Sequence, residues 1–234
     1  MRTVITDVRI NGECERNLAE RGFDVIKLPA SAMIQKPVSA HPDMLIFIGK
    51  DRLVCHRSYY DHASETLELI ADRAGLDILI SDELWGQEYP NDVLFNAAQI
   101  GDRLICRSLS TSLLVLDAFA PENIVDVKQG YAKCSVCTVG NNGVITSDRS
   151  IAKPLEMTDI DLLLIEDGHT ALDGYGCGFI GGTSGDDGEN IYFCGNLELH
   201  PEADKIKEFC LAHGRQPISL SNAPLYDYGT LMFI

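Results

Sequence analysis

Three aspartates stand just before apolar runs that are candidate strands. Asp43 precedes MLIF, Asp92 precedes VLF, and Asp227 precedes the C-terminal run YGTLMFI. If the starts of these strands meet in the fold, three carboxylates would repel one another and hold protons unless a cation joins them. A guanidinium or amine ligand would supply that cation, because its donors pair with carboxylates. The competing interpretation is that each aspartate accepts turn amides at the start of a strand.

One cysteine, Cys134, has neighbours suited to thiolate chemistry. A cation beside a thiol lowers the thiol pKa and keeps the nucleophilic thiolate available, and Lys133 and His41 are candidates for that role. We predict Cys134 as a nucleophile and His41 as its acid/base, with Lys133 and Tyr131 among the substrate-binding groups. The prediction requires the thiol to face the site from a strand over 133–138. The alternative for Cys134 is a buried packing residue, and the separate alternative for His41 is a loop histidine at a strand start.

The glycine-richest segment is 167–188, DGHTALDGYGCGFIGGTSGDDG. It lacks a following helix and the lysine or GxGxxG pattern of a phosphate-binding loop. We predict that His169 belongs to a lid over the substrate site, with a simple long connection as the alternative. The acidic tip DDGEN lacks the spaced ligands of a calcium loop, and the two cysteines of CSVC would point to opposite faces of a strand. We therefore predict neither a metal nor a cofactor.

The elements that must position these residues form a repeat. A short apolar strand recurs with starts about 40 to 50 residues apart, in the range typical of propellers and solenoids: VITD at 4, LVC at 53, LIC at 104, VITSD at 144 and IYFC at 191. The inner four follow another apolar run and a turn rich in Gly, Asn or Asp, which predicts a hairpin. The fifth hairpin is divided between the two ends of the chain. Pairing strand 228–234 with the N-terminal strand would close a ring without an exposed sheet edge.

A helix and another strand follow each hairpin. Helices are predicted over 13–21, 64–74, 110–119 and 201–213, while Pro154 allows only a short or broken helix in 148–158. Gly22, Gly75 and Gly214 stand where left-handed helix caps are expected. The unit is thus ββαβ, used five times, and the fold class is α/β. A ring whose ends pair cannot be divided, so 1–234 is predicted to be a single domain.

Composition limits the partners. The formal net charge of −16 opposes extended contact with phosphate backbones, so nucleic acid is not expected. No run of 18 apolar residues and no signal-like leader is visible, so we expect a cytoplasmic protein without membrane contact. Eight cysteines in 234 residues indicate reduced thiols rather than a disulfide framework. A homo-oligomer is a possible assembly.

Five ββαβ units around a pseudo-fivefold axis resemble the pentein fold, the α/β propeller of the guanidino-group-modifying enzymes. PDMLIF at 42–47 looks like the first-blade segment of the dimethylarginine dimethylaminohydrolases, and NDVLF at 91–95 resembles their GGDVLF segment. The resemblance implies that Asp43 and Asp92 are pore carboxylates that help to bind the substrate. The resemblance in architecture extends over the whole chain, whereas the resemblance in sequence motifs is limited to about a dozen residues.

Two departures separate this chain from those hydrolases. Their third-blade histidine corresponds to Tyr131, whose ordinary pKa of about 10 prevents it from taking that role near neutral pH. Their nucleophilic cysteine lies in the last hairpin, where this chain has Gly229 and Thr230. The chain therefore resembles an uncharacterised bacterial branch of the fold. The function implied is a hydrolase or transferase acting on a small cationic guanidino- or amidino-type metabolite through a rearranged site. The alternatives are a non-catalytic binder of such a molecule and a protein-interaction scaffold.

Overall fold

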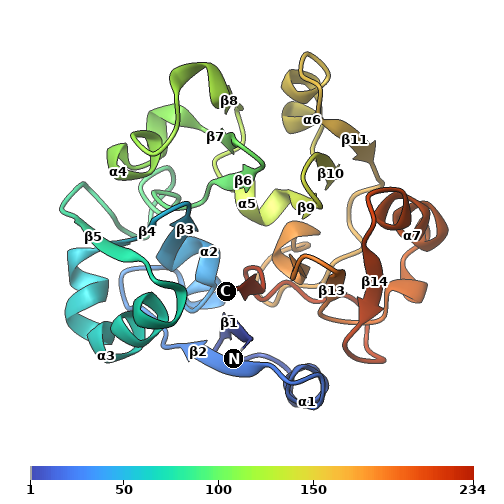
Figure 1. The fold of residues 1–234 in the computed structure, drawn as a ribbon, viewed down its shortest axis with the longest axis horizontal. Coiled ribbons are helices and arrows are strands. Elements are labelled where there is room, and N and C mark those ends of the chain that lie inside the picture. Colours follow the sequence, from blue (N-terminus) through green and yellow to red (C-terminus); the bar gives the residue numbers. More distant parts are fainter. Residues whose placement is uncertain (1) are drawn as a thin grey trace.

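The computed structural model describes residues 2–234 and places five small sheets around one axis (Figure 1). Each sheet has three strands in the order inner, middle, outer, and a helix joins the middle strand to the outer one. We call each sheet with its helix a blade. The inner strand runs antiparallel to the middle strand, and the middle strand runs parallel to the outer one. A parallel pair needs a long crossover, which explains the helix in each blade.

The layers of the ring contain equivalent elements. The inner strands are β15 (Met232–Phe233), β3 (Ile46–Gly49), β6 (Ala98–Ile100), β9 (Cys137–Val139) and β12 (Ser184–Asp186). The middle strands are β1 (Thr3–Asp7), β4 (Arg52–His56), β7 (Arg103–Cys106), β10 (Gly143–Thr146) and β13 (Asn190–Phe193). The crossover helices are α1 (Gly12–Glu20), α3 (Arg57–Ala74), α4 (Leu113–Leu116), α6 (Arg149–Leu155) and α7 (Ala203–Ala212). The outer strands are β2 (Asp24–Leu28), β5 (Asp77–Ser81), β8 (Ile124–Asp126), β11 (Asp161–Leu164) and β14 (Gln216–Ser219).

The two chain ends close the ring. Strand β15 pairs antiparallel with β1, with Met232 opposite Ile5 and Phe233 opposite Val4. Backbone hydrogen bonds of 3.1 and 3.0 Å between Thr3 and Ile234 extend the pairing. The C-terminus lies near the centre in Figure 1, where β15 contacts β12, the inner strand of the last blade. The predicted five-bladed ring closed by its terminal strands is confirmed.

The helices show why the pattern predicts them. In α3, Leu67, Ile70 and Ala71 are buried against the sheet, at helical spacing on one face. The His56 side chain accepts a hydrogen bond from the Ser58 amide at the helix start. At the other end Gly75 has φ 65°, a left-handed cap that costs glycine little. Gly22 and Gly214 are left-handed too, as predicted.

Some predicted bounds are wrong in detail. The helix predicted over 110–119 begins only after Ser112, whose hydroxyl caps the Leu114 amide, and ends at Leu116. The segment with Pro154 does form a short helix, α6, which ends one residue after the proline. The inner strands start later than the apolar runs predict. One helical turn precedes two of them: α2 (Pro42–Leu45) and α5 (Ala132–Ser135). The run VLF at 93–95 lies before β6 rather than in it, and β15 contains only two residues of the strand predicted over 228–234. Among residues 2–234, no helix has the length and apolar character needed to cross a membrane.

Candidate functional site

The segments that precede the inner strands meet around the pore axis and are tied together by buried hydrogen bonds. Asn96 is the central connector: its Oδ1 accepts from the Lys133 amide at 2.7 Å and the Cys134 amide at 3.2 Å, and its Nδ2 donates to the Asp43 carbonyl at 3.0 Å. Thr230 Oγ1 donates to Asp43 Oδ2 at 2.8 Å. Four blades are thereby joined through side chains. Sequence reasoning missed Asn96, although a polar residue directly after the apolar run VLF is a usable signal.

Asp227 is held in the pore by backbone amides. Its two carboxylate oxygens accept from the amides of Phe179 and Gly229, both at 2.9 Å. Gly182 packs so closely that a Cβ there would collide with the carboxylate. Burial raises the pKa of Asp227 to about 6, with nearby His41 opposing the rise and Asp43 adding to it. The aspartate is therefore poised to change charge near neutral pH.

His41 lies between two carboxylates and is only 1% exposed. Its Nδ1 is 3.6 Å from Asp227 Oδ1 and its Nε2 is 3.9 Å from Asp7 Oδ2. Within residues 2–234, Nδ1 has no hydrogen-bond partner. An imidazole with carboxylates on both sides is suited to proton transfer. Asp7, which terminates β1, was not among the residues predicted for the site.

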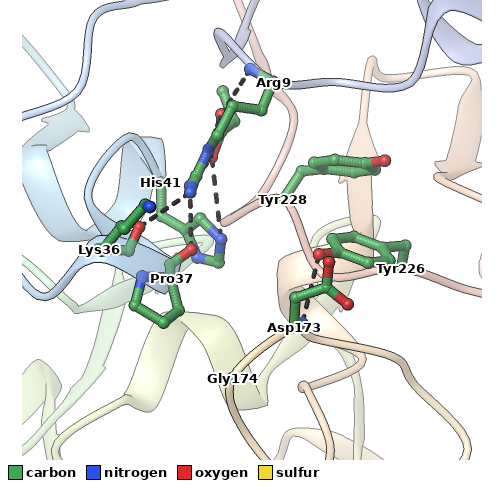
Figure 2. Close-up of a pocket in the computed structure, with 9 residues that line it drawn as sticks. Arg9, Lys36, Pro37, His41, Asp173, Gly174, Tyr226 and Tyr228 are labelled. Atoms are coloured by element: carbon green, nitrogen blue, oxygen red, sulfur yellow. Dashed lines mark hydrogen bonds and ion pairs between the residues drawn. The ribbon is translucent and has the colours of Figure 1, made fainter.

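A pocket of about 530 Å³ opens beside His41 (Figure 2). Nine residues line it: Asp7, Arg9, Lys36, Pro37, His41, Asp173, Gly174, Tyr226 and Tyr228. The two tyrosine rings are 4.6 Å apart and tilted by 34°. In Figure 2 they lie across the pocket from His41, with Asp173 beside Tyr226. The backbone amide of Asp173 donates to the Tyr226 hydroxyl at 3.3 Å, so this loop is fixed to the pocket wall.

Arg9 closes one side of this pocket. Its Nη2 donates to Asp7 Oδ2 at 2.5 Å, and its Nε donates to Asp7 Oδ1 at 2.9 Å. Further donors reach the carbonyls of Lys36 at 2.9 Å and Pro37 at 3.0 Å. The Asp7 carboxylate raises the pKa of Arg9 and is itself occupied by this guanidinium. Asp7 is thus already paired, and Asp173 is the other carboxylate that lines the pocket.

Asp92 and Tyr131 form a separate pair that does not line this pocket. The Tyr131 hydroxyl donates to Asp92 Oδ2 at 2.5 Å, while Asp92 Oδ1 has no partner among residues 2–234. Burial raises the pKa of both groups, and the hydrogen bond opposes the rise for Asp92. The Tyr131 ring stacks on Phe179 with ring centroids 6.2 Å apart. The substrate contacts predicted for Asp92 and Tyr131 stay predictions.

The activated thiolate predicted at Cys134 is not what the structure shows. Cys134 belongs to helix α5 rather than to a strand, is 3% exposed, and accepts from Asn96 Nδ2 at 3.0 Å. Burial raises the Cys134 pKa well above its ordinary value, and Asp43 and Asp227 raise it further. Burial also lowers the pKa of Lys133, which weakens the cation expected to stabilise the thiolate. The prediction of a lowered thiol pKa is wrong because desolvation outweighs the lysine.

His169 lies away from the pocket that its loop helps to form. Its Nε2 is 3.7 Å from Glu166 Oε2, and its ring packs edge-on against His200 at 5.1 Å. The same loop contributes Asp173 and Gly174 to the pocket wall instead. Within the described part of the chain, no three His, Cys, Asp or Glu side chains gather as a metal site. All eight cysteines are free.

Comparison with known proteins identifies the fold. The model of a family described as "Family of unknown function (DUF6873)" matches residues 5–232. No curated protein sequence matches the chain. Dimethylarginine dimethylaminohydrolase from Pseudomonas aeruginosa in complex with citrulline is similar at TM-score 0.57 and 13% identity, covering 94% of this chain and 91% of that one. C. jejuni agmatine deiminase is similar at TM-score 0.57 and 10% identity, covering 99% of this chain and 80% of that one. The fold is therefore the pentein fold of the guanidino-modifying enzymes.

Proposed function

We propose that this chain, which belongs to the DUF6873 family, binds a small metabolite with a cationic guanidino- or amidino-type group in the pocket beside His41. The observation that carries the proposal is the pairing of Tyr226 and Tyr228 with Asp173 on one wall of a 530 Å³ pocket. Aromatic faces attract a planar cation, and a carboxylate accepts its donors. The likeness of the fold to dimethylarginine dimethylaminohydrolase and agmatine deiminase supports this ligand class.

The test is binding of a guanidinium and of its neutral isostere. Calorimetry and thermal-shift assays measure the binding of agmatine and arginine, which carry a guanidinium, and of citrulline, the uncharged isostere of arginine. The comparison separates the effect of ligand charge from that of ligand shape. We expect the cations to stabilise the protein and citrulline to do so much less. Tyr228→Leu should weaken cation binding by roughly 2- to 30-fold, the range that a cation–π contact of about 0.5–2 kcal/mol implies.

A matched surface change controls that experiment. Asp204 on α7 is 90% exposed and remote from the pocket, so Asp204→Asn should leave binding unchanged. Asp173→Asn should weaken it, because one acceptor for the cation loses its charge. Equal affinity for arginine and citrulline, or loss of binding in Asp204→Asn but not Asp173→Asn, would contradict the proposed cation site.

The placement of His41 between Asp7 and Asp227 favours a second candidate function, hydrolysis of a C–N bond in the same ligand. His41 would accept a proton as water adds to the guanidinium carbon and return it to the departing amine, so that one water is consumed and one amine is released. No cysteine takes part in this route. The Cys134 mechanism predicted from the sequence is the competing one.

Two variants distinguish these mechanisms. If His41 is the acid/base, His41→Gln should lower the rate of ammonia or amine release by about 100-fold or more, while Cys134→Ala should retain it. Activity lost in Cys134→Ala but kept in His41→Gln would favour the thiolate route instead. A chain that binds the cations and releases no amine is the non-catalytic binder.

A further inference from the structure

A second cavity runs along the ring axis and shares no lining residue with the pocket beside His41. Its volume is about 170 Å³, and all five inner strands contribute to its wall. The wall is mostly apolar, with Phe95, Leu231 and Met232 among its residues. Cavities of about 150 Å³ bind benzene-sized molecules, so this one has room for a ligand of that size.

Lys133 is the cationic side chain that lines this cavity, and the residue is partly buried. In the described part of the chain, its Nζ makes a single hydrogen bond, a long one of 3.4 Å to the carbonyl of Val136. Within residues 2–234, no carboxylate lies within 4.0 Å of Nζ in an ion pair. An ammonium group has three donors, so a single weak bond favours the neutral amine in this apolar setting. Burial lowers the pKa of Lys133 in the same direction, and the nearby Asp43 carboxylate opposes this lowering without reversing it.

Asp43 lines the same cavity and keeps one carboxylate oxygen without a partner among residues 2–234. Thr230 Oγ1 fixes its Oδ2 at 2.8 Å, which leaves Oδ1 without a partner in the described residues. The other carboxylate on the wall, Asp186, is already paired with Arg215 Nε at 2.8 and 2.9 Å. The Asp43 carboxylate would repel a ligand that carries its own carboxylate, but it would not repel an uncharged ligand. The chemistry of the cavity thus favours an uncharged electrophile.

We propose that this axial cavity is a carbonyl-binding site in which the Lys133 amine forms an imine with a small, neutral, apolar aldehyde or ketone. The amine nitrogen bonds to the carbonyl carbon, and the carbonyl oxygen leaves as water with the two protons of the amine. Asp43 relays those protons from nitrogen to oxygen. The net reaction joins one carbonyl compound to Lys133 and releases one water, so no oxidant or reductant is needed. The site does not depend on the function proposed for the pocket beside His41.

Reductive trapping tests the proposal. The full chain is treated with butanal and cyanoborohydride, and mass spectrometry follows the alkylation rate at each lysine. Lys205, whose side chain is 66% exposed, serves as the internal reference. We expect Lys133 to react at least tenfold faster than Lys205. A rate at Lys133 equal to or below that at Lys205 would overturn the proposal.

Two variants assign the reaction to the cavity. Lys133→Met should abolish the fast alkylation and leave Lys205 unchanged. Thr138→Trp places a large ring in the cavity from β9 while keeping Lys133, and should slow Lys133 alkylation by about tenfold without affecting Lys205. A thermal unfolding midpoint of the Thr138→Trp variant close to that of the wild type would show that the five-bladed fold is intact. Fast alkylation that persists in Thr138→Trp would show that Lys133 is reached from outside the cavity and would also overturn the proposal.

Discussion

At the scale of single residues, burial decides the chemistry of the pore. Cys134 and Asp227 both lie in a desolvated centre, and desolvation favours the protonated form of each. For the thiol the result is a poor nucleophile. The carboxylate oxygens of Asp227 accept hydrogen bonds from two backbone amides, and the pKa of Asp227 stays close enough to neutrality to be functional. From residue type alone, an ionised role was expected for both Cys134 and Asp227. Their different surroundings give the two groups different protonation behaviour.

The raised pKa of Asp227 predicts a pH-dependent stability. Because the folded state holds this proton more tightly than the unfolded state, the stabilisation is fully present below about pH 4 and is lost as pH rises through about 6. Relative to Asp227→Asn, the wild-type free energy of unfolding should fall by about 3 kcal/mol between these limits. Urea unfolding of both proteins from pH 4 to pH 8 measures this difference. A difference that stays constant with pH would contradict the assignment.

Thiol labelling tests the burial of Cys134. Cys177 is partly exposed and its pKa is raised by partial burial, whereas Cys134 is 3% exposed and burial raises its pKa well above the ordinary value. Iodoacetamide should therefore label Cys177 first in the native protein and reach Cys134 only when the ring opens. Site-resolved mass spectrometry gives both rates, and Cys177→Ser shows that the fast signal belongs to Cys177. Native labelling of Cys134 as fast as that of Cys177 would restore the thiolate hypothesis.

At the scale of elements, one helical turn before the inner strand changes the direction of the residues that matter. Asp43 and Cys134 were expected at strand starts, but α2 and α5 hold them on short helices. In a strand, successive side chains point to opposite faces, so a shift of one residue reverses the direction of a side chain. In a helix, successive side chains are rotated by a smaller angle, so the side chain points elsewhere. The repeat predicted the blades correctly because strand and helix periodicity extends over many residues. Single turns carry no such periodic signal.

The helix caps give an element-scale prediction. Gly75→Ala should lower the free energy of unfolding by about 1 kcal/mol, because Gly75 has φ 65° and alanine is strained there. Gly86→Ala is the matched control: a Cβ at either glycine has open space, but Gly86 is not left-handed. Chemical denaturation measures both variants. Equal effects would show that the cap conformation of Gly75 contributes nothing.

At the scale of the whole molecule, the ring depends on the pairing of its two ends. The Phe233 ring on β15 packs against Phe23 at 5.0 Å and Tyr192 at 5.1 Å, so one side chain joins two blades. The closure also positions the site, since Tyr226, Tyr228 and Thr230 precede β15 in the same terminal segment. Stability and site geometry are therefore coupled through the last residues of the chain.

Phe233→Ala should destabilise the entire ring in one cooperative transition. We expect a loss of about 2–4 kcal/mol, since a large aromatic anchor is removed from a half-buried position. Leu211→Ala on α7, at a side chain 50% exposed, should change stability by less than about 1 kcal/mol. Circular dichroism and tryptophan fluorescence should report the same midpoint for Phe233→Ala. A separate early transition would show that the first and last blades unfold independently.

The sequence by itself determined the fivefold ββαβ repeat, the closure of the ring and the presence of Asp43, His41 and Asp227 near its centre. It did so because strand alternation, helix periodicity and glycine caps are local signals that recur in each blade. Only the tertiary structure decided that Asp7 and Arg9 complete the pocket, that Asn96 connects the blades, and that Lys133 lines a separate cavity. Those relations join residues far apart in the chain, and pKa values depend on burial, which no local pattern of residues contains.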